Sequence, residues 1–512
     1  MAAKLLVEFD DLPWVGWRDE GSRMEPAYDQ PIVDIARYIF HYEINEADEK
    51  LWARAQLALL DTLGCAIETA ATSDECRKLL KASSMGMTIP DGFRVPGTNL
   101  QVGPLEGAFD FGVLIRYLDH NDALGGAEWG HPSDNIAAIL AVMDWLSRMA
   151  ASGRLTHIGP PLNMRTLLIA LIKAYEIQGC YQMRNAFNSY GIDHVVLVKL
   201  ASAAIVSWLL GLTEEQTMAC ISHVWMDGQP TRVYRARDNT IPRKGWAAGD
   251  AARRAVQLAL YVQASQPGSP GALSSKPWGF WARTFGATGF LFARPFGTWT
   301  VQNVLFKTMP VEGHAISAVE AVLIQIRRCR ELGLSSPMQD IRRIDLRTTA
   351  AADLIINKKG PLRNFADRDH CIQYVVALAC LKGRAPEAVD YLDTSPWATN
   401  EDLKCLMDKI AVSPDPVLTR DYLDLDKKSL GTGVTIHLKN LSVLPEILVE
   451  YPLGHVRNPR TNTFLEAKFS QNMARMFSKT ETAQIAGAVH RPDMQISSFV
   501  DLLARPASQP KL

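Results

Sequence analysis

The stretch from residue 118 to residue 135 holds more acid–base chemistry than a connector between helices needs. It carries four carboxylic acids, two histidines and three glycines. Apolar helical patterns occupy residues 108–118 before it and 136–146 after it. Connections between packed helices usually take about two to eight residues, so this one is long as well as polar. The stretch therefore predicts a loop that serves a functional site.

His131 stands just ahead of the helix predicted over residues 136–146. Free backbone N–H groups and the positive end of the helix dipole favour an anionic ligand at such a place. The same field disfavours imidazolium, so we expect His131 to stay neutral and to act as a base near neutral pH. The alternative is a histidine that only caps the helix or bonds within the loop.

Three further segments carry residue types that could complete a site. His194 begins a strongly apolar helix, and Arg235 and Lys244 fall in a basic loop before another helix. His370 and Tyr374 lie four residues apart, on one face of a predicted helix start. Histidines and a tyrosine can move protons, and basic side chains hold carboxylates, so a small polycarboxylate is the substrate class that fits.

Composition and charge exclude several partners. The 512 residues are 47% hydrophobic and carry a formal net charge of -1, which gives no reason to expect nucleic acid as a partner. No apolar run reaches the roughly 18 residues that span a bilayer. Eight cysteines occur singly, without C-x-x-C spacing, so neither a zinc ribbon nor an iron–sulfur cluster is expected.

The N-terminus resembles neither a secretory signal nor a transit peptide, so we expect a cytoplasmic protein. The final Pro510-Lys511-Leu512 approaches a peroxisomal address but lacks its serine, and leaves that compartment open.

Hydrophobic periodicity predicts a mainly α fold with an inserted α+β unit. Residues 1–30 form an N-terminal arm, and residues 31–276 follow helical patterns almost throughout. After a Gly-, Pro- and Ser-rich linker, alternating apolar residues predict strands near 344–348, 434–438 and 447–451. We expect a discontinuous all-helical domain, formed by 31–276 with 456–512, and a smaller α+β lid domain over 277–455.

Five motifs occur in order along the chain. They read AEWGHPSDN (127–135), GIDHVVLVK (191–199), KGWAAGD (244–250), NVLFK (303–307), and KGPL with ADRDHCIQY (359–374). Together they resemble the 2-methylcitrate dehydratases of the MmgE/PrpD superfamily, which also holds cis-aconitate decarboxylase. The resemblance extends from about residue 30 to about residue 505.

The resemblance implies a site in the cleft between the helical domain and the lid, a homodimer, and chemistry without metal or other cofactor. We expect His131 and His194 to share the proton transfers, with Tyr374 as a further donor and Asp119 orienting a histidine. The expected contacts to a tricarboxylate substrate are Lys244, Lys307, Arg235, Asp122 and His370.

The central loop departs from the family pattern. Where the family has Asp-Thr-Trp-Leu-Ala-Ala-Glu-Trp, this chain has Asp-Ala-Leu-Gly-Gly-Ala-Glu-Trp over residues 122–129. Losing a tryptophan and gaining two glycines predicts a larger pocket and a substrate with a longer alkyl chain.

The expected activity is conversion of a 2-alkylcitrate or 2-methylcitrate to the 2-alkyl-cis-aconitate, in a pathway that forms maleic anhydrides. The alternatives are a decarboxylase of an aconitate-type acid, an isomerase or epimerase of a dicarboxylate, and a non-catalytic paralogue that binds alkylcitrates. The lost threonine, a carboxylate donor, keeps the last alternative open.

Overall fold

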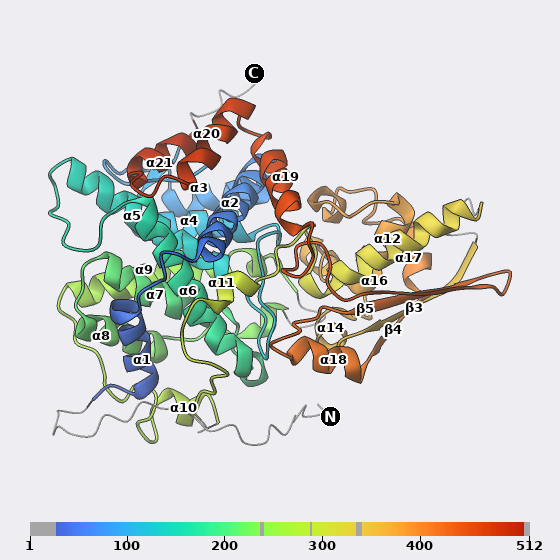
Figure 1. The fold of residues 1–512 in the computed structure, drawn as a ribbon, viewed down its shortest axis with the longest axis horizontal. Coiled ribbons are helices and arrows are strands. Elements are labelled where there is room, and N and C mark those ends of the chain that lie inside the picture. Colours follow the sequence, from blue (N-terminus) through green and yellow to red (C-terminus); the bar gives the residue numbers. More distant parts are fainter. Residues whose placement is uncertain (1–26, 236–239, 287–288, 334–339, 506–512) are drawn as a thin grey trace.

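The computed structural model describes residues 27–235, 240–286, 289–333 and 340–505. Most of the predicted arm, the end of the predicted C-terminal segment and the Pro-Lys-Leu ending lie outside them. Within the described residues a helical body lies beside a smaller unit that contains a sheet (Figure 1), which confirms the predicted mainly α fold with an α+β part. No described helix has both the length and the apolarity that a membrane crossing needs.

The helical body is built around α7, which is apolar on all sides and buried along almost its whole length. Gly112 of α4 and Gly249 of α9 bring these two helices into close contact, since a Cβ on Gly112 would lie 2.7 Å from the Cα of Gly249. The helices of the body are α1 (Gln30–His41), α2 (Glu49–Thr72), α3 (Asp74–Ser84), α4 (Pro104–Arg116), α5 (Ile136–Ala151), α6 (Met164–Arg184), α7 (Val195–Leu209), α8 (Glu214–Met226), α9 (Ala247–Gln263), α10 (Phe280–Arg283) and α11 (Trp299–Asn303).

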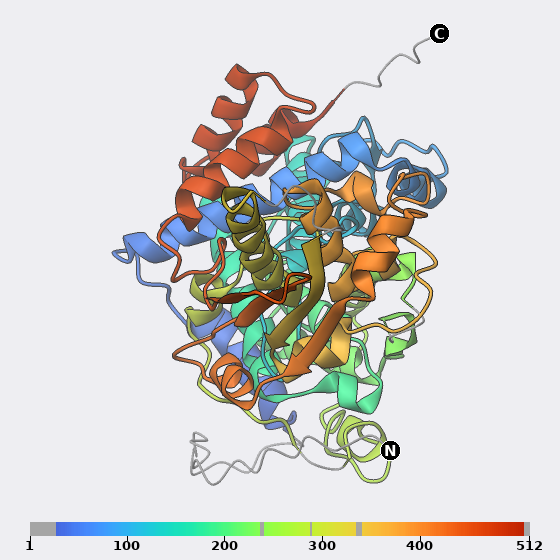
Figure 2. The ribbon, with the colours of Figure 1, turned by 90° about the vertical axis from the view of Figure 1, so that its right-hand side faces the viewer.

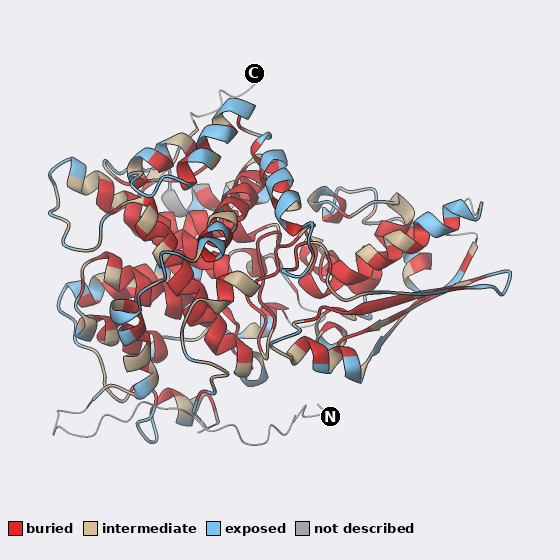
Figure 3. Ribbon diagram, in the orientation of Figure 1, coloured by how far each residue is buried: buried red, intermediate tan, exposed pale blue. Residues whose placement is uncertain are grey.

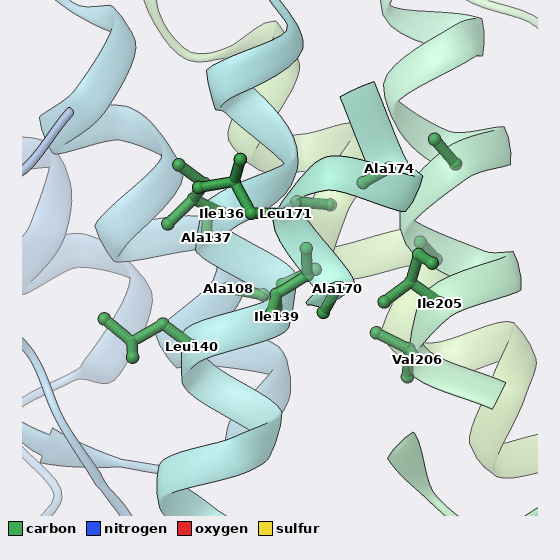
Figure 4. Close-up of a cluster of buried hydrophobic side chains, with 14 of the residues drawn as sticks. Ala108, Ile136, Ala137, Ile139, Leu140, Ala170, Leu171, Ala174, Ile205 and Val206 are labelled. Atoms are coloured by element: carbon green, nitrogen blue, oxygen red, sulfur yellow. The ribbon is translucent and has the colours of Figure 1, made fainter. Parts of the chain in front are cut away.

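Small and branched side chains fill the centre of this body. Ala108 of α4, Ile139 of α5, Ala170 of α6 and Ile205 of α7 gather in one buried cluster (Figure 4). A small antiparallel two-stranded sheet, β1 (Phe93–Arg94) with β2 (Gln101–Val102), packs against α4 and α5. The burial pattern places the most buried segments at the middle of the body (Figure 3).

The second unit is a four-stranded mixed sheet packed against helices (Figure 2). Strand order is β4-β3-β5-β6, with β3 parallel to β4 and antiparallel to β5. The bounds confirm the three predicted strands and add the short β4. The elements are α12 (Ile316–Glu331), β3 (Ile341–Thr348), α14 (Ala350–Ile356), α15 (Phe365–Arg368), α16 (Ile372–Lys382), α17 (Glu401–Met407), β4 (Ile410–Pro414), α18 (Pro416–Leu423), β5 (Thr432–Leu438) and β6 (Val443–Val449).

The tail returns to the helical body as α19 (Thr461–Met473), α20 (Lys479–Val489) and α21 (Ile496–Leu503). Leu465, Phe469 and Met473 of α19 are buried in the body's core, beside α2 (Figure 1). Residues between α10 and α11, and Phe306 after them, also pack in this core. We therefore propose that the lid begins just after Lys307, later than the residue 277 expected from the sequence.

Candidate functional site

Two histidines face each other at the starts of two helical segments. His131 precedes the 3-10 turn η1 (Pro132–Asn135), which leads into α5, and His194 directly precedes α7. Their ring centroids are 5.7 Å apart, and the side chains are only 1% and 3% exposed. The structure thus confirms the predicted positions at helix starts and brings the two imidazoles together.

The hydrogen bonds of His131 fix its tautomer. Nδ1 lies 2.6 Å from the carbonyl oxygen of Asp122, which only accepts, so Nδ1 carries the proton. Nε2 lies 2.8 Å from Nη2 of Arg116, which only donates, so Nε2 keeps its lone pair. Burial first, and then the positive charges of Arg116 and Lys307, lower the pKa of His131 well below its usual value. His131 is therefore a neutral imidazole, as expected.

His194 has no hydrogen bond on either ring nitrogen among the described residues, although both nitrogens are buried. The nearest carboxylate oxygen is on Asp193, 3.5 Å from Nδ1. Burial lowers the pKa of His194 well below its usual value. Since unpaired buried polar atoms cost free energy, this ring is available to a ligand that the described residues do not supply.

Arg235 is linked to His194 through the neighbouring residue, Asp193. Its Nε donates to Asp193 Oδ2 at 2.7 Å, and its Nη2 donates to the carbonyl oxygen of Lys244 at 3.2 Å. It therefore fixes the residue before His194 and the backbone of a site lysine through two of its three nitrogens, and its expected role toward substrate stays a prediction.

Asp119 is the central carboxylate of the site. Its φ of 53° lies in the left-handed region, which costs energy for a residue other than glycine and is often found at functional sites. Lys307 Nζ lies 2.7 Å from its Oδ1, Arg116 also binds Oδ1, and Lys244 Nζ lies 3.6 Å from its Oδ2. Burial raises the pKa of Asp119, but Arg116, Lys307 and Lys244 outweigh it and hold the pKa well below its usual range.

We expected Asp119 to orient a histidine, but the structure gives that task to other groups. Asp119 Oδ1 is 3.9 Å from His131 Nε2, beyond hydrogen-bond distance. The carbonyl of Asp122 and the guanidinium of Arg116 orient His131 instead. The carboxylate of Asp119 serves to hold the surrounding cations.

The lid reaches this cluster through Asp369 and His370. Lys244 Nζ lies 2.7 Å from Asp369 Oδ2, whose other oxygen lies 2.6 Å from His370 Nδ1, and His370 Nε2 is 3.8 Å from Asp119 Oδ2. The ligand atoms of Asp119, Asp369 and His370 are close enough to hold a metal ion. However, the ammonium of Lys244 contacts both carboxylates and supplies the positive charge there.

Two of the predicted side chains bond to protein groups. The hydroxyl of Tyr374 donates to the carbonyl oxygen of Asp390 at 3.2 Å, and its ring packs in the lid core beside Tyr391. The Asp122 carboxylate accepts from the backbone N–H and the hydroxyl of Ser133, at 3.1 and 2.5 Å. Their expected roles toward substrate stay predictions.

Three site residues were not predicted. Arg116 ends α4, Asp369 precedes a predicted histidine, and Lys468 lies on α19. Lys468 Nζ donates to Asp61 Oδ1 at 2.7 Å and to the carbonyl oxygens of His120 and Lys307 at 2.9 and 2.8 Å. A charged residue in the apolar pattern of α4 was a visible signal for Arg116; nothing in the local sequence marks Lys468.

The two loop glycines do not open space at their own positions. A Cβ on Gly125 would lie 2.7 Å from the hydroxyl oxygen of Tyr422 and 2.9 Å from Trp129 Cζ3. A Cβ on Gly126 would lie 2.8 Å from the carbonyl oxygen of Gln182. The glycines permit close packing between loop, lid and α6, which corrects the expectation that they enlarge the pocket.

The chain resembles known proteins along almost its whole length. It matches the MmgE/PrpD N-terminal domain over residues 33–293 and the MmgE/PrpD C-terminal domain over residues 309–491. It is 60% identical to a protein of a fungal species named alkylcitrate dehydratase phiI, over 94% of this chain and 95% of that one. The protein of the same name from Talaromyces stipitatus is 52% identical, with 94% and 98% covered. The 2-methylcitrate dehydratase of Escherichia coli K12 is 43% identical, with 94% and 98% covered.

Proposed function

Because the chain belongs to the MmgE/PrpD family, we propose that it is a hydro-lyase that converts a 2-alkylcitrate to the corresponding 2-alkyl-cis-aconitate. The observation that carries this proposal is the pair of neutral, buried imidazoles 5.7 Å apart, beside the ammonium groups of Lys244 and Lys307. A base, and cations to hold carboxylates, are what this elimination requires.

The proposed reaction removes one proton and one hydroxide from the substrate. A neutral imidazole, of His131 or His194, takes the proton from the carbon beside a carboxylate. The electron pair left behind forms the carbon–carbon double bond, and the carbon–oxygen bond to the hydroxyl breaks. The imidazolium then returns its proton to the leaving hydroxide, so water departs and both histidines end neutral. Lys244 and Lys307 bind carboxylates and offset the developing negative charge.

Similarity supports a longer alkyl group than methyl. The two relatives named alkylcitrate dehydratase are 60% and 52% identical to the chain, whereas the relative named 2-methylcitrate dehydratase is 43% identical. Each methylene buried on binding contributes about 0.8 kcal/mol, so the length of the alkyl group can select among substrates. The proposed substrate class is therefore citrates with alkyl groups longer than methyl.

The test is a panel of citrate, 2-methylcitrate and longer 2-alkylcitrates, with products followed by mass spectrometry and by the absorbance of the new alkene. We expect loss of water, with kcat/KM rising beyond methyl. Loss of carbon dioxide from the corresponding aconitates would replace the proposal by a decarboxylase, and binding without turnover would make the chain a non-catalytic paralogue. An optimum at methyl would refute the chain-length argument alone.

Two finer proposals accompany this one. We propose that dehydration needs no metal, because Lys244 supplies the positive charge between Asp119 and Asp369. Dialysis against a chelator should leave kcat unchanged, and activity restored only by an added divalent ion would contradict this. We also propose a homodimer, which light scattering after gel filtration tests directly.

A further inference from the structure

Arg116 is a fully buried cation with an unusual set of partners. It ends α4, where the helix dipole favours a positive charge, and it is 1% exposed. One guanidinium nitrogen binds the carboxylate of Asp119, and another lies 2.8 Å from the imidazole Nε2 of His131. Its third nitrogen, Nε, has no hydrogen-bond partner among the described residues and lies 3.9 Å from Asp134 Oδ2. One of the three guanidinium nitrogens is thus directed at a neutral ring.

We propose that Arg116 is a substrate-binding residue that also controls the base: it masks Nε2 of His131 in the empty site and moves to a substrate carboxylate when the site fills. The inference rests on the proposed dehydration for its last step, in which the freed Nε2 accepts the carbon-bound proton. The proton count balances as in the dehydration proposed above, because the imidazolium passes this proton to the leaving hydroxide and water departs.

The exchange of partners follows from hydrogen-bond strength. A guanidinium binds a carboxylate through two charge-assisted bonds, which are stronger than one bond to a neutral imidazole nitrogen. Within ion-pair distance, Arg116, Lys307 and Lys244 meet Asp119 and Asp369, and Arg116 also lies 3.9 Å from Asp134, whose pKa burial raises to about 7. We therefore expect an entering polycarboxylate to bind Arg116 more strongly than the imidazole of His131 does.

The same contact keeps His131 uncharged in the empty site. A protonated ring would place two cations 2.8 Å apart in a buried setting. The other ionisable groups near the ring are Lys307, Asp119 and His194, and Asp134 lies three residues further along the chain. Asp119 is shared among three cations, so it compensates little of the repulsion that a protonated His131 would meet.

Two variants and two readouts test the inference. Arg116→Gln removes the charge, and Arg116→Lys keeps it without the planar fork. Arg148→Gln is the matched control, since Arg148 pairs with Asp144 of its own helix, α5, and with Asp501 of α21. Calorimetry with propane-1,2,3-tricarboxylate measures binding, because this acid has no hydroxyl to eliminate. Histidine ring NMR, assigned with His131→Gln, measures the titration of His131.

We expect Arg116→Gln to weaken tricarboxylate binding about 10- to 100-fold and to move the titration of His131 to higher pH, while Arg148→Gln changes neither. Arg116→Lys should keep His131 neutral and lose part of the affinity. Circular dichroism shows whether each variant folds. If Arg116→Gln does not fold, the affinity of Arg116→Lys for the tricarboxylate tests the inference. Unchanged affinity in a folded Arg116 variant, or an unmoved His131 titration in Arg116→Gln, would overturn the inference. If these shifts occur but no alkylcitrate is dehydrated, the proposed function fails and the arginine's role stands.

Discussion

Replacing Lys468 by methionine should destabilise the fold and slow the reaction, because one ammonium joins three segments around the site. Its Nζ lies 2.7 Å from Asp61 Oδ1, 2.9 Å from the carbonyl oxygen of His120 and 2.8 Å from that of Lys307. Burial alone would lower the pKa of Lys468, but the Asp61 carboxylate outweighs burial and raises it, so the group is charged. Methionine keeps a similar length and removes both the charge and the donors.

The size of the effect follows from what the substitution leaves behind. Removing one partner of a buried ion pair costs about 3–5 kcal/mol, because the other charge stays buried and uncompensated. Replacing Asp61 by leucine in the same chain removes that stranded charge and should restore most of the stability. Activity should not return, since the backbones beside Asp119 and at Lys307 are no longer held, and a misplacement of about 1 Å costs about 100-fold in rate.

Urea unfolding gives the free energy of unfolding, and kcat/KM with the best alkylcitrate gives the activity. The matched control is Lys173→Met, because Lys173 is a buried lysine of α6 that donates to the carbonyl oxygen of Ile39, at 2.6 Å, among residues outside the site. It should lose stability and keep kcat/KM. Activity that recovers together with stability in the double variant would refute the positioning role of Lys468.

Three further predictions concern a site histidine, a buried carboxyl group and the packing of the central loop. His131→Ala should lower kcat by about 100-fold or more without unfolding the protein, and a smaller loss would remove this ring from the proton transfers. The Asp110 carboxyl is buried with neither oxygen hydrogen-bonded among the described residues, and burial raises its pKa to about 8. The folded chain therefore holds an extra proton between about pH 4 and pH 8, and stability falls as pH rises through that window. Asp110→Asn should remove up to about 1.4 kcal/mol per pH unit of this slope in urea unfolding, and an unchanged slope would contradict it. Gly125→Ala should lower the free energy of unfolding by about 1–3 kcal/mol, since its methyl would meet Tyr422. Gly487→Ala, whose methyl meets nothing within 4 Å, should be neutral or stabilising. Equal effects of the two substitutions would contradict the close packing around Gly125.

Local sequence was enough to predict features that depend on local structure. The positions of His131 and His194 follow from apolar helices that begin just after them, and β3 and β5 follow from alternating apolar residues. The short β4 was missed because only its first residue is fully buried, so its pattern carries little signal.

Features that depend on distant partners were missed or misread. Lys468 binds groups 161 and 348 residues away in the sequence, and no local pattern records such contacts. The glycines of the central loop predicted open space, but Tyr422 of the lid, almost 300 residues further on, fills the space beside Gly125. The sequence shows Arg116 as a charged residue at a helix end, but it does not indicate that Arg116 contacts His131.

Because α19 follows most of the site residues in the sequence and packs back on the helical body, the enzyme can become active only after α19 has been synthesised. A ribosome adds Lys468 161 residues after Lys307, so for that part of translation the carbonyl oxygens of His120 and Lys307 lack the ammonium that later joins them. A nascent chain can already contain both imidazoles and most of the cations, yet its loops are not fixed. Catalysis should therefore begin only after Lys468 has been synthesised and α19 has packed on the body, and a product truncated before α19 should be inert even where it folds.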